Sequence, residues 1–191
     1  MKTILATLLA TTFIAGTAVA ETDWSGVYAG AAASSNSGNM DYDNNGNVTA
    51  YAMSTSPLYG AFAGYNMQNG AMVYGVELAY SVGELSFDGY PDDFINSFFD
   101  AKVRVGYAAG QALIYAVAGG TAGQYIEEED PYFIDFTGIN YGVGVDYKIN
   151  DKMFAGIEYL MRDVGGEYRD YPLERGDFQT QSIQARIGYK F

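Results

Sequence analysis

The chain has 191 residues, of which 23 are acidic and 10 are basic, and it contains neither histidine nor cysteine. Without cysteine it can form no disulfide, thiolate metal site or thiol nucleophile, and without histidine it can form no Ser-His or Cys-His catalytic pair. The acidic run at 127–130 is typical of a solvated segment rather than of a shielded acid–base pair, so we expect no catalytic residues and no enzyme activity. The 18 tyrosines and 24 glycines, with only 4 prolines and few helix signals, favour an all-β protein.

Residues 1–20 have the features of a secretory signal peptide. Lys2 supplies a basic start, residues 4–20 form an uncharged and largely apolar run, and the run ends in Ala18-Val19-Ala20. Small residues at these positions fit a cleavage site between Ala20 and Glu21. An amino-terminal membrane anchor is the alternative, but the run is short and ends in small side chains. We therefore expect residues 21–191 to form a single exported domain.

Apolar and polar residues alternate with period two through most of this domain. In QSIQARIGYKF, for example, Ile183 and Ile187 share one face, whereas Gln184 and Arg186 share the other. Such alternation indicates β-strands that present one face to an apolar environment. Eight segments are predicted as strands, at about 24–34, 57–67, 71–83, 98–108, 112–123, 135–149, 152–163 and 179–191.

The spacers between these segments alternate in length. Short spacers lie at 68–70, 109–111 and 150–151, and long ones at 35–56, 84–97, 124–134 and 164–178. An even number of strands with short turns at one end and long loops at the other is typical of outer-membrane barrels. The pattern thus predicts an eight-stranded antiparallel transmembrane up-and-down β-barrel.

The first long spacer contains DYDNNGNVTAYA, in which Asp41, Asp43 and Asn45 have the spacing of ligands in a calcium-binding loop. The twelfth position of such a loop carries a bidentate Glu, and here it is Ala52. Asn and Gly in succession also favour a tight turn, because both tolerate positive φ. We expect a turn, with these three residues as a weak calcium candidate only.

The composition of the two strand faces separates a membrane barrel from a soluble one. The face opposite the apolar one is mainly Gly, Ala, Ser, Asn and single charges, which suits a narrow lumen better than a solvated surface. Aromatic residues of the apolar face cluster near the short turns, as expected for an interfacial girdle. The predicted girdle consists of Tyr65, Tyr74, Tyr107, Tyr115, Tyr147, Tyr189 and Phe191.

Charged residues on the lumen face are predicted to pair. Counted from the short turns, Glu77 should lie level with Arg104, and Glu158 level with Arg186. An isolated charge in a narrow lumen would be costly, so a hydrogen-bonded network is expected. Its function is either to plug and brace the barrel or to line a narrow, gated ion path. The predicted network comprises Glu77, Lys102, Arg104, Asp146, Lys148, Glu158, Arg162, Arg186 and Lys190, with Lys102 and Arg162 higher and Asp146, Lys148 and Lys190 nearer the short turns.

The long spacers are acidic and contain aromatic residues. They hold, with their margins, 16 of the 23 acidic residues and only two arginines, whereas the predicted barrel wall is neutral. This charge makes nucleic-acid binding improbable. Loops on a rigid scaffold commonly carry recognition, so adhesion is one possible role. Divalent cations could also bridge these carboxylates to lipopolysaccharide phosphates.

Two short motifs resemble a known family. The opening WSGVYAG, Trp24 to Gly30, resembles the start of small outer-membrane β-barrel proteins of Gram-negative bacteria, and ARIGYKF resembles their last strand. The similarity is to OmpA/OmpX-type barrels and to opacity-like surface proteins of the "porin family". This resemblance implies that Tyr189 and Phe191 form the signal read by the barrel-assembly machinery.

The sequence therefore predicts a monomeric outer-membrane barrel without cofactor, in contact with outer-membrane lipid and lipopolysaccharide. Its long acidic loops are expected outside the cell and its short turns in the periplasm. The favoured function is a structural, surface-exposed protein that contributes to envelope integrity. A small low-conductance channel is the first alternative, and an adhesin or ligand-binding surface protein is the second.

Overall fold

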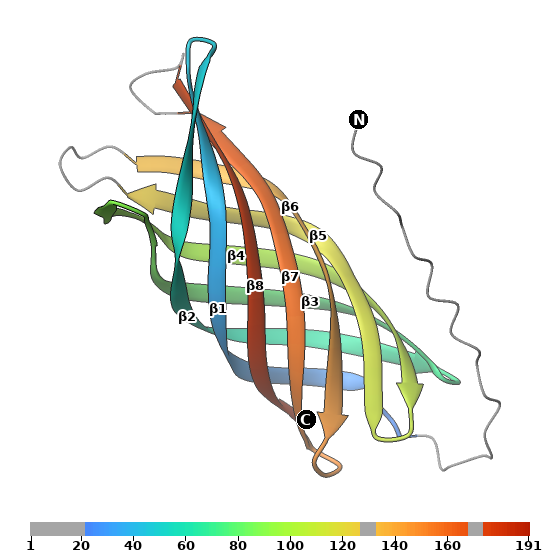
Figure 1. The fold of residues 1–191 in the computed structure, drawn as a ribbon. Helices are drawn as coiled ribbons and strands as arrows, with labels where there is room; N and C mark the ends of the chain where they lie inside the picture. Colours follow the sequence, from blue (N-terminus) through green and yellow to red (C-terminus); the bar gives the residue numbers. More distant parts are fainter. Residues whose placement is uncertain (1–21, 127–132, 168–173) are drawn as a thin grey trace, which may run out of the picture.

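The computed structural model describes residues 22–126, 133–167 and 174–191, which form one closed β-barrel (Figure 1). Each strand pairs antiparallel with its neighbours in sequence, and β8 closes the barrel by pairing with β1. The predicted fold class and strand number are confirmed. The predicted cleavage site and the acidic run at 127–130 lie outside the described residues. The strands are β1 (Gly26–Asn44), β2 (Asn47–Asn69), β3 (Met72–Phe87), β4 (Tyr90–Ala109), β5 (Ala112–Ile126), β6 (Phe133–Lys148), β7 (Met153–Glu167) and β8 (Glu174–Lys190).

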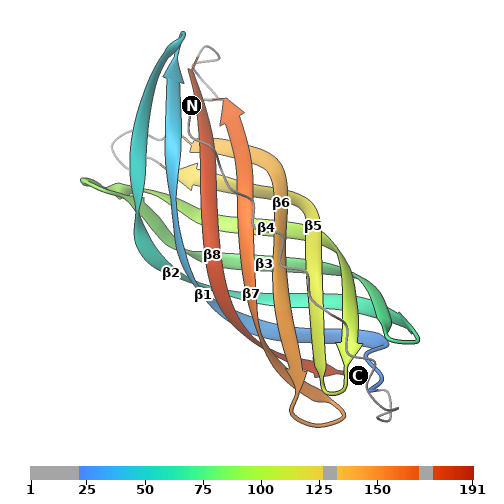
Figure 2. The same cartoon turned by 45° about the vertical axis from the view of Figure 1, so that its right-hand side comes forward.

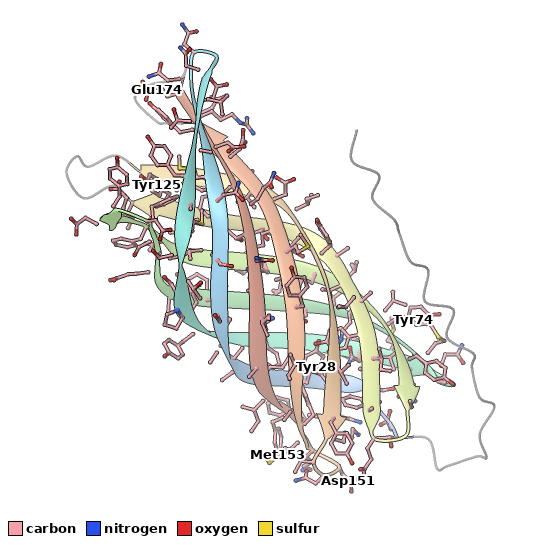
Figure 3. All side chains as sticks on the ribbon, viewed as in Figure 1. Tyr28, Tyr74, Tyr125, Asp151, Met153 and Glu174 are labelled. Carbon is pink, nitrogen blue, oxygen red and sulfur yellow. The ribbon has the colours of Figure 1, made fainter. Side chains whose placement is uncertain are left out.

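The two ends of the barrel differ. Short connections at 70–71, 110–111 and 149–152 lie together with the carboxy terminus at one end, here called the turn end (Figure 2). The opposite end, here called the hairpin end, is where β1 and β2 project past the neighbouring strands (Figures 1 and 2). Figure 3 labels Asp151 and Met153 at the turn end and Glu174 at the hairpin end.

The strands at the hairpin end are longer than predicted. Most of the expected loops at 35–56 and 84–97 instead continue β1 to β4 as paired strands, and parts of 124–134 and 164–178 belong to β5 to β8. The prediction of long loops is therefore wrong over most of its described length. Polar residues on both faces removed the alternation that marks a strand in the sequence. Backbone pairing between adjacent strands needs no such alternation, and it satisfies the backbone polar groups along most of these segments.

The segment DYDNNGNVTAYA forms the tip of the β1–β2 hairpin. Asn44 pairs with Asn47, and the two residues between them have positive φ, at 52° for Asn45 and 92° for Gly46. This is a two-residue type I′ turn, which Asn-Gly favours. The Gly46 amide donates to the Asp43 carboxylate at 2.6 Å. The predicted turn is confirmed. Within the described ranges, no three acidic, His or Cys side chains come together as a metal site.

The outer wall is apolar around the middle of the barrel. Tyr74, labelled in Figure 3, is 45% exposed, and the predicted girdle residues other than Tyr115 likewise face outward. In a bilayer these side chains would be covered by lipid rather than water. Among the residues that the structure describes, no helix is long and apolar enough to cross a membrane.

Tyr115 was predicted on the outer face but lies inside the barrel, where it is only 3% exposed. Alternation could not decide its side, because β5 is apolar on both faces. Leu113 and Val117 point inward with Tyr115, whereas Ile114 points outward. The ring of Tyr115 lies opposite Gly144 of β6, which leaves space for it.

Gly144 and Tyr115 illustrate how large rings fit inside this narrow barrel. Five inward aromatic residues each lie directly across from a glycine on the adjacent strand. A Cβ added at any of these glycines would overlap the facing aromatic side chain. These five glycines thus leave the space that the rings occupy. The pairs are Tyr28–Gly64, Phe62–Gly30, Tyr115–Gly144, Phe136–Gly123 and Phe154–Gly188.

Gly144→Ala is expected to lower the free energy of unfolding by about 1–3 kcal/mol, because the new methyl group must displace the Tyr115 ring. That ring also supports Arg104, whose guanidinium carbon lies 3.6 Å from the ring centroid. Urea unfolding in lipid vesicles, followed by fluorescence of the single tryptophan, Trp24, measures the change.

Gly120→Ala is the matched control for Gly144→Ala. Gly120 lies on the outer face of β5, and the nearest atom to an added Cβ is the Gly138 carbonyl oxygen at 3.7 Å. This variant should stay within about 0.5 kcal/mol of the wild type. Equal losses in the two variants would contradict the proposed fit between ring and glycine.

Candidate functional site

Six buried charged side chains form a layer across the middle of the lumen, here called the central charge layer. They come from five strands and comprise three acids and three bases, so that their charges balance. Each acid lies within ion-pair distance of at least two of the bases. The layer consists of Glu77 of β3, Lys102 and Arg104 of β4, Asp146 of β6, Glu158 of β7 and Arg186 of β8.

Glu77 is the most connected member of this layer. Its carboxylate lies 2.8 Å from the Lys102 ammonium and 2.5 Å from the Arg186 guanidinium. It also accepts a hydrogen bond from the Tyr28 hydroxyl at 2.9 Å, and Arg104 lies further away at 3.9 Å. A buried carboxylate surrounded in this way has its desolvation offset by several charge-assisted bonds.

The other two acids complete the layer. Glu158 lies 2.7 Å from Lys102 and 2.9 Å from Arg186, and Asp146 pairs with Arg104. Lys102 therefore bridges Glu77 and Glu158 across the lumen from β4 to β3 and β7. Because the contacts Lys102–Glu158 (β4 to β7) and Arg186–Glu77 (β8 to β3) join strands that are not neighbours, the layer ties opposite walls of the barrel together.

A second ion pair lies on the hairpin side of the central charge layer. Asp100 of β4 accepts hydrogen bonds from the Arg162 guanidinium at 2.7 and 3.1 Å and from the Thr121 hydroxyl at 2.6 Å. The Asn140 amide also donates to Asp100, at 3.3 Å. Asp100 was missed in the sequence analysis, although it shares the inward face with Lys102 two residues later.

The structure changes the predicted heights of two network residues. Glu77 pairs in register with Lys102, not with Arg104, which lies opposite Gly75. Lys102 was expected above the central charge layer and Asp146 near the short turns, yet both belong to that layer. Glu158 and Arg186 do meet, at 2.9 Å.

The remaining two predicted network lysines lie at the turn end. Lys148 and Lys190 donate to the backbone carbonyl of Asp23, at 2.5 and 2.8 Å. Lys190 also pairs with the Asp23 carboxylate at 2.7 Å, and this hydrogen bond lowers the pKa of Asp23 to about 2. The segment before β1 is thereby held against β6 and β8.

Two apolar layers, one toward each end, fill the lumen beyond the charges. The composition of this face predicts small and polar residues and does not reveal these rings, because the glycines that make room for them lie on the adjacent strand. The hairpin-side apolar layer consists of Met40, Met53, Leu58, Leu85, Phe87, Ile95, Phe98, Tyr125, Phe136, Val164 and Phe178. The turn-side apolar layer consists of Trp24, Tyr28, Phe62, Val73, Ala108, Leu113, Tyr115, Val117, Phe154 and Leu160.

Two small cavities border the central charge layer. One, of about 10 Å³, lies between Trp24, Asn66 and Arg104, and another, of about 20 Å³, lies between Glu77, Arg186 and Ala32. Each has room for about one water molecule. Three buried polar groups that line the first cavity, the Trp24 and Arg104 Nε groups and the Asn66 Oδ1, have no partner among the described residues.

A closed eight-stranded barrel with an apolar outer wall and an interior filled by side chains defines a small integral outer-membrane barrel protein. The sequence agrees with this class. The chain belongs to the outer membrane protein beta-barrel domain family, whose profile matches residues 6–191.

Two groups of relatives extend this comparison. The chain is 32% identical over 143 residues to the 25 kDa outer-membrane immunogenic protein of Brucella abortus, which covers 69% of the chain and 64% of the relative. It thus spans just under two thirds of the length of that relative. It is also 30% identical over 176 residues to the 22 kDa outer membrane protein of Rhizobium leguminosarum, covering 88% of the chain and 78% of the relative.

Solved structures with low sequence identity share the fold. OprG from Pseudomonas aeruginosa has a TM-score of 0.57 at 12% identity, covering 87% of this chain and 96% of that one. Neisserial surface protein A has a TM-score of 0.53 at 15% identity, and Ail of Yersinia pestis one of 0.52 at 10%. These two matches also cover 87% of this chain, and 98% and 99% of the other chains.

Proposed function

We propose that the protein is a monomeric structural barrel that does not conduct ions and that contributes to the integrity of the outer membrane. Its hairpin end, which carries most of the acidic residues, faces outside the cell, and its turn end faces the periplasm. The single observation that carries the proposal is the filled lumen, in which a balanced charge layer lies between two apolar layers.

The energetics of the lumen support this function over a channel. An ion that crossed the barrel would have to separate contacts such as Lys102–Glu158 at 2.7 Å and Arg186–Glu77 at 2.5 Å. It would also have to pass the packed rings of Phe136 and Phe178, whose centroids are 5.2 Å apart. Removing one partner from a buried ion pair costs about 3–5 kcal/mol. A continuous water path would require several such pairs to separate, and the cost of separating them opposes it.

Single-channel recording in a planar bilayer tests the proposal. Folded protein, verified by its altered gel mobility before boiling, is expected to give a silent bilayer. Arg186→Ala should lower the stability of the barrel without producing conductance, whereas Arg175→Ala, at an exposed pair with Asp177, should change neither. Discrete openings of the folded wild type that change when Arg104 or Arg186 is neutralised would replace this function by a channel.

Recognition at the cell surface is a second candidate function. It is favoured by the hairpin end, where the exposed ring of Tyr90 packs edge-on against Tyr51 at 5.8 Å beside the acidic Asp88 and Asp92. The Brucella relatives are called immunogenic, which agrees with outward exposure of this end. Replacing Tyr51 and Tyr90 by serine should abolish binding to cells or matrix if this function operates, with the barrel still folded.

Assembly by the barrel-assembly machinery is proposed to depend on the last strand. Tyr189 and Phe191 both project outward, and their rings meet edge-on at 5.2 Å. Their place on the outer surface leaves them accessible to a partner before the barrel is surrounded by lipid.

A further inference from the structure

A polar stretch interrupts the apolar outer wall on the hairpin side. It runs over β7, β8 and β1 and consists of Ser35, Ser37, Asn39, Asp163, Gln179 and Gln181. In register, the outward ring of Tyr59 on β2 lies opposite Ala33 of β1, one outward position nearer the turn end than Ser35. The polar stretch therefore lies on the hairpin side of this ring.

This stretch forms a groove on the outside of the barrel with a volume of about 390 Å³. Its lining includes the outward side chains Asn39, Tyr141, Met161, Asp163, Gln179 and Gln181. The volume falls within the range of small-molecule sites, which is about 300–1,000 Å³. Tyr141 and Met161 supply an apolar side to the groove, and the amides and the carboxylate supply a polar one.

A chain of hydrogen bonds fixes the turn-side edge of this groove. The Tyr159 hydroxyl donates to Gln181 Oε1 at 2.7 Å, and Gln181 Nε2 donates to the Ser37 hydroxyl at 3.3 Å. These contacts join β7, β8 and β1 and hold Gln181 in place. The side chains of Asn39, Gln179 and Asp163 make no hydrogen bond to any other part of the described chain. Their polar atoms are thus available to a ligand.

The polar and apolar side chains of the groove together determine which class of lipid would fit it. Amides both donate and accept hydrogen bonds and carboxylates accept them, so together they suit a group with many hydroxyls. Asp163 disfavours a bare phosphate by charge repulsion. Below the groove, Ile183 and Ile157 continue the apolar wall, where an acyl chain would pack. A ligand whose hydroxyl-rich head is joined to acyl chains fits both surfaces at once.

We propose that this groove binds the saccharide headgroup of a glycolipid in the outer leaflet of the membrane. The inference rests on the orientation in the proposed function, which places the hairpin end at the outer surface. It goes beyond that function by assigning a specific lipid site to one side of the barrel wall.

Native mass spectrometry of the folded full chain tests the site, in a polyoxyethylene detergent that carries no competing sugar. The probes are purified short-chain lipopolysaccharide and, as a phospholipid without saccharide, phosphatidylglycerol. The double variant Gln179→Leu/Gln181→Leu should retain lipopolysaccharide about tenfold more weakly, because it removes two amides that can donate to and accept from sugar hydroxyls. Phosphatidylglycerol retention should not change.

Gln124→Leu is the matched control, because Gln124 lies on β5 and does not line the groove. It should retain lipopolysaccharide like the wild type. Asn39→Val provides a second test with a single change in case the double variant does not fold. Equal retention by the groove variants and the control, or equal loss of phosphatidylglycerol, would overturn the glycolipid site. The proposed function is tested separately by single-channel recording. A folded barrel without conductance would still support that function even if the glycolipid site were refuted, whereas a conducting barrel would refute the function irrespective of lipid binding.

Discussion

Glu77→Gln is expected to lower the free energy of unfolding by about 3–5 kcal/mol, the loss typical of removing one partner from a buried ion pair. Glutamine keeps the shape of the side chain but not its charge. Lys102 and Arg186, now 2.8 and 2.5 Å from the carboxylate, would lose an anionic partner in a layer where every charge is buried. The central charge layer would then hold one excess cation. Urea unfolding in lipid vesicles, with Trp24 fluorescence as the signal, measures the loss.

Two further variants separate this effect from a general response to mutation. Glu84→Gln makes the same change on the same strand at an exposed position, and it should stay within about 0.5 kcal/mol of the wild type. Adding Lys102→Met to Glu77→Gln should recover part of the loss, because it removes the excess cation. A loss for Glu77→Gln no larger than for Glu84→Gln would show that the charge layer does not stabilise the barrel.

The sequence was sufficient to predict the strand number, the closure and the outer wall of this barrel. Alternation such as that around Ile183 and Ile187 reports which side chains share a face, and the positions of the short turns order the strands. Where β5 is apolar on both faces, alternation carried no such information. The side of Tyr115 then depended on space provided by Gly144 of the next strand, which only the register reveals.

Register also explains why part of the charge layer was misplaced. Heights were predicted by counting along each strand from its own short turn, but β3 and β4 are joined at the hairpin end and begin from different turns. In a closed barrel the strands are tilted and their register is staggered, so equal counts from different turns do not give equal heights. Lys102 therefore takes the place opposite Glu77 that the count assigned to Arg104.

The strands at the hairpin end were predicted as loops for a different reason. Residues such as Asp41 and Asn44 have low strand propensity and break the alternation, yet they pair along the full length of the β1–β2 hairpin. Strand propensity is weak compared with the benefit of continuing a ladder that is already formed. The Asn45-Gly46 turn was the reliable local signal, because it alone fixes a two-residue hairpin.

Phe136→Ala is expected to lower the free energy of unfolding by about 3–5 kcal/mol, because it empties the middle of the hairpin-side apolar layer. The Phe136 ring packs between Phe98 and Phe178, with centroid distances of 5.7 and 5.2 Å, and it lies over Gly123 of β5. Glycine has no side chain that could move into the space. The strands are held by their ladders, so the barrel cannot contract, and a cavity remains.

Phe99→Ala is the control for the cavity left by Phe136→Ala. Phe99 projects outward from β4 and is 45% exposed, so lipid would fill the vacated space and its loss should be less than half as large. An apolar cavity of this kind stays dry and can bind benzene. Benzene binds only the folded state of Phe136→Ala, in this cavity. Adding benzene should therefore raise the free energy of unfolding of this variant by more than it raises that of the wild type. Two results would contradict this packing: equal stabilisation of Phe136→Ala and the wild type by benzene, or a loss of stability in Phe136→Ala no larger than in Phe99→Ala. The hairpin side of the lumen would then be loosely packed and open to water, and a channel would become the better account of this barrel.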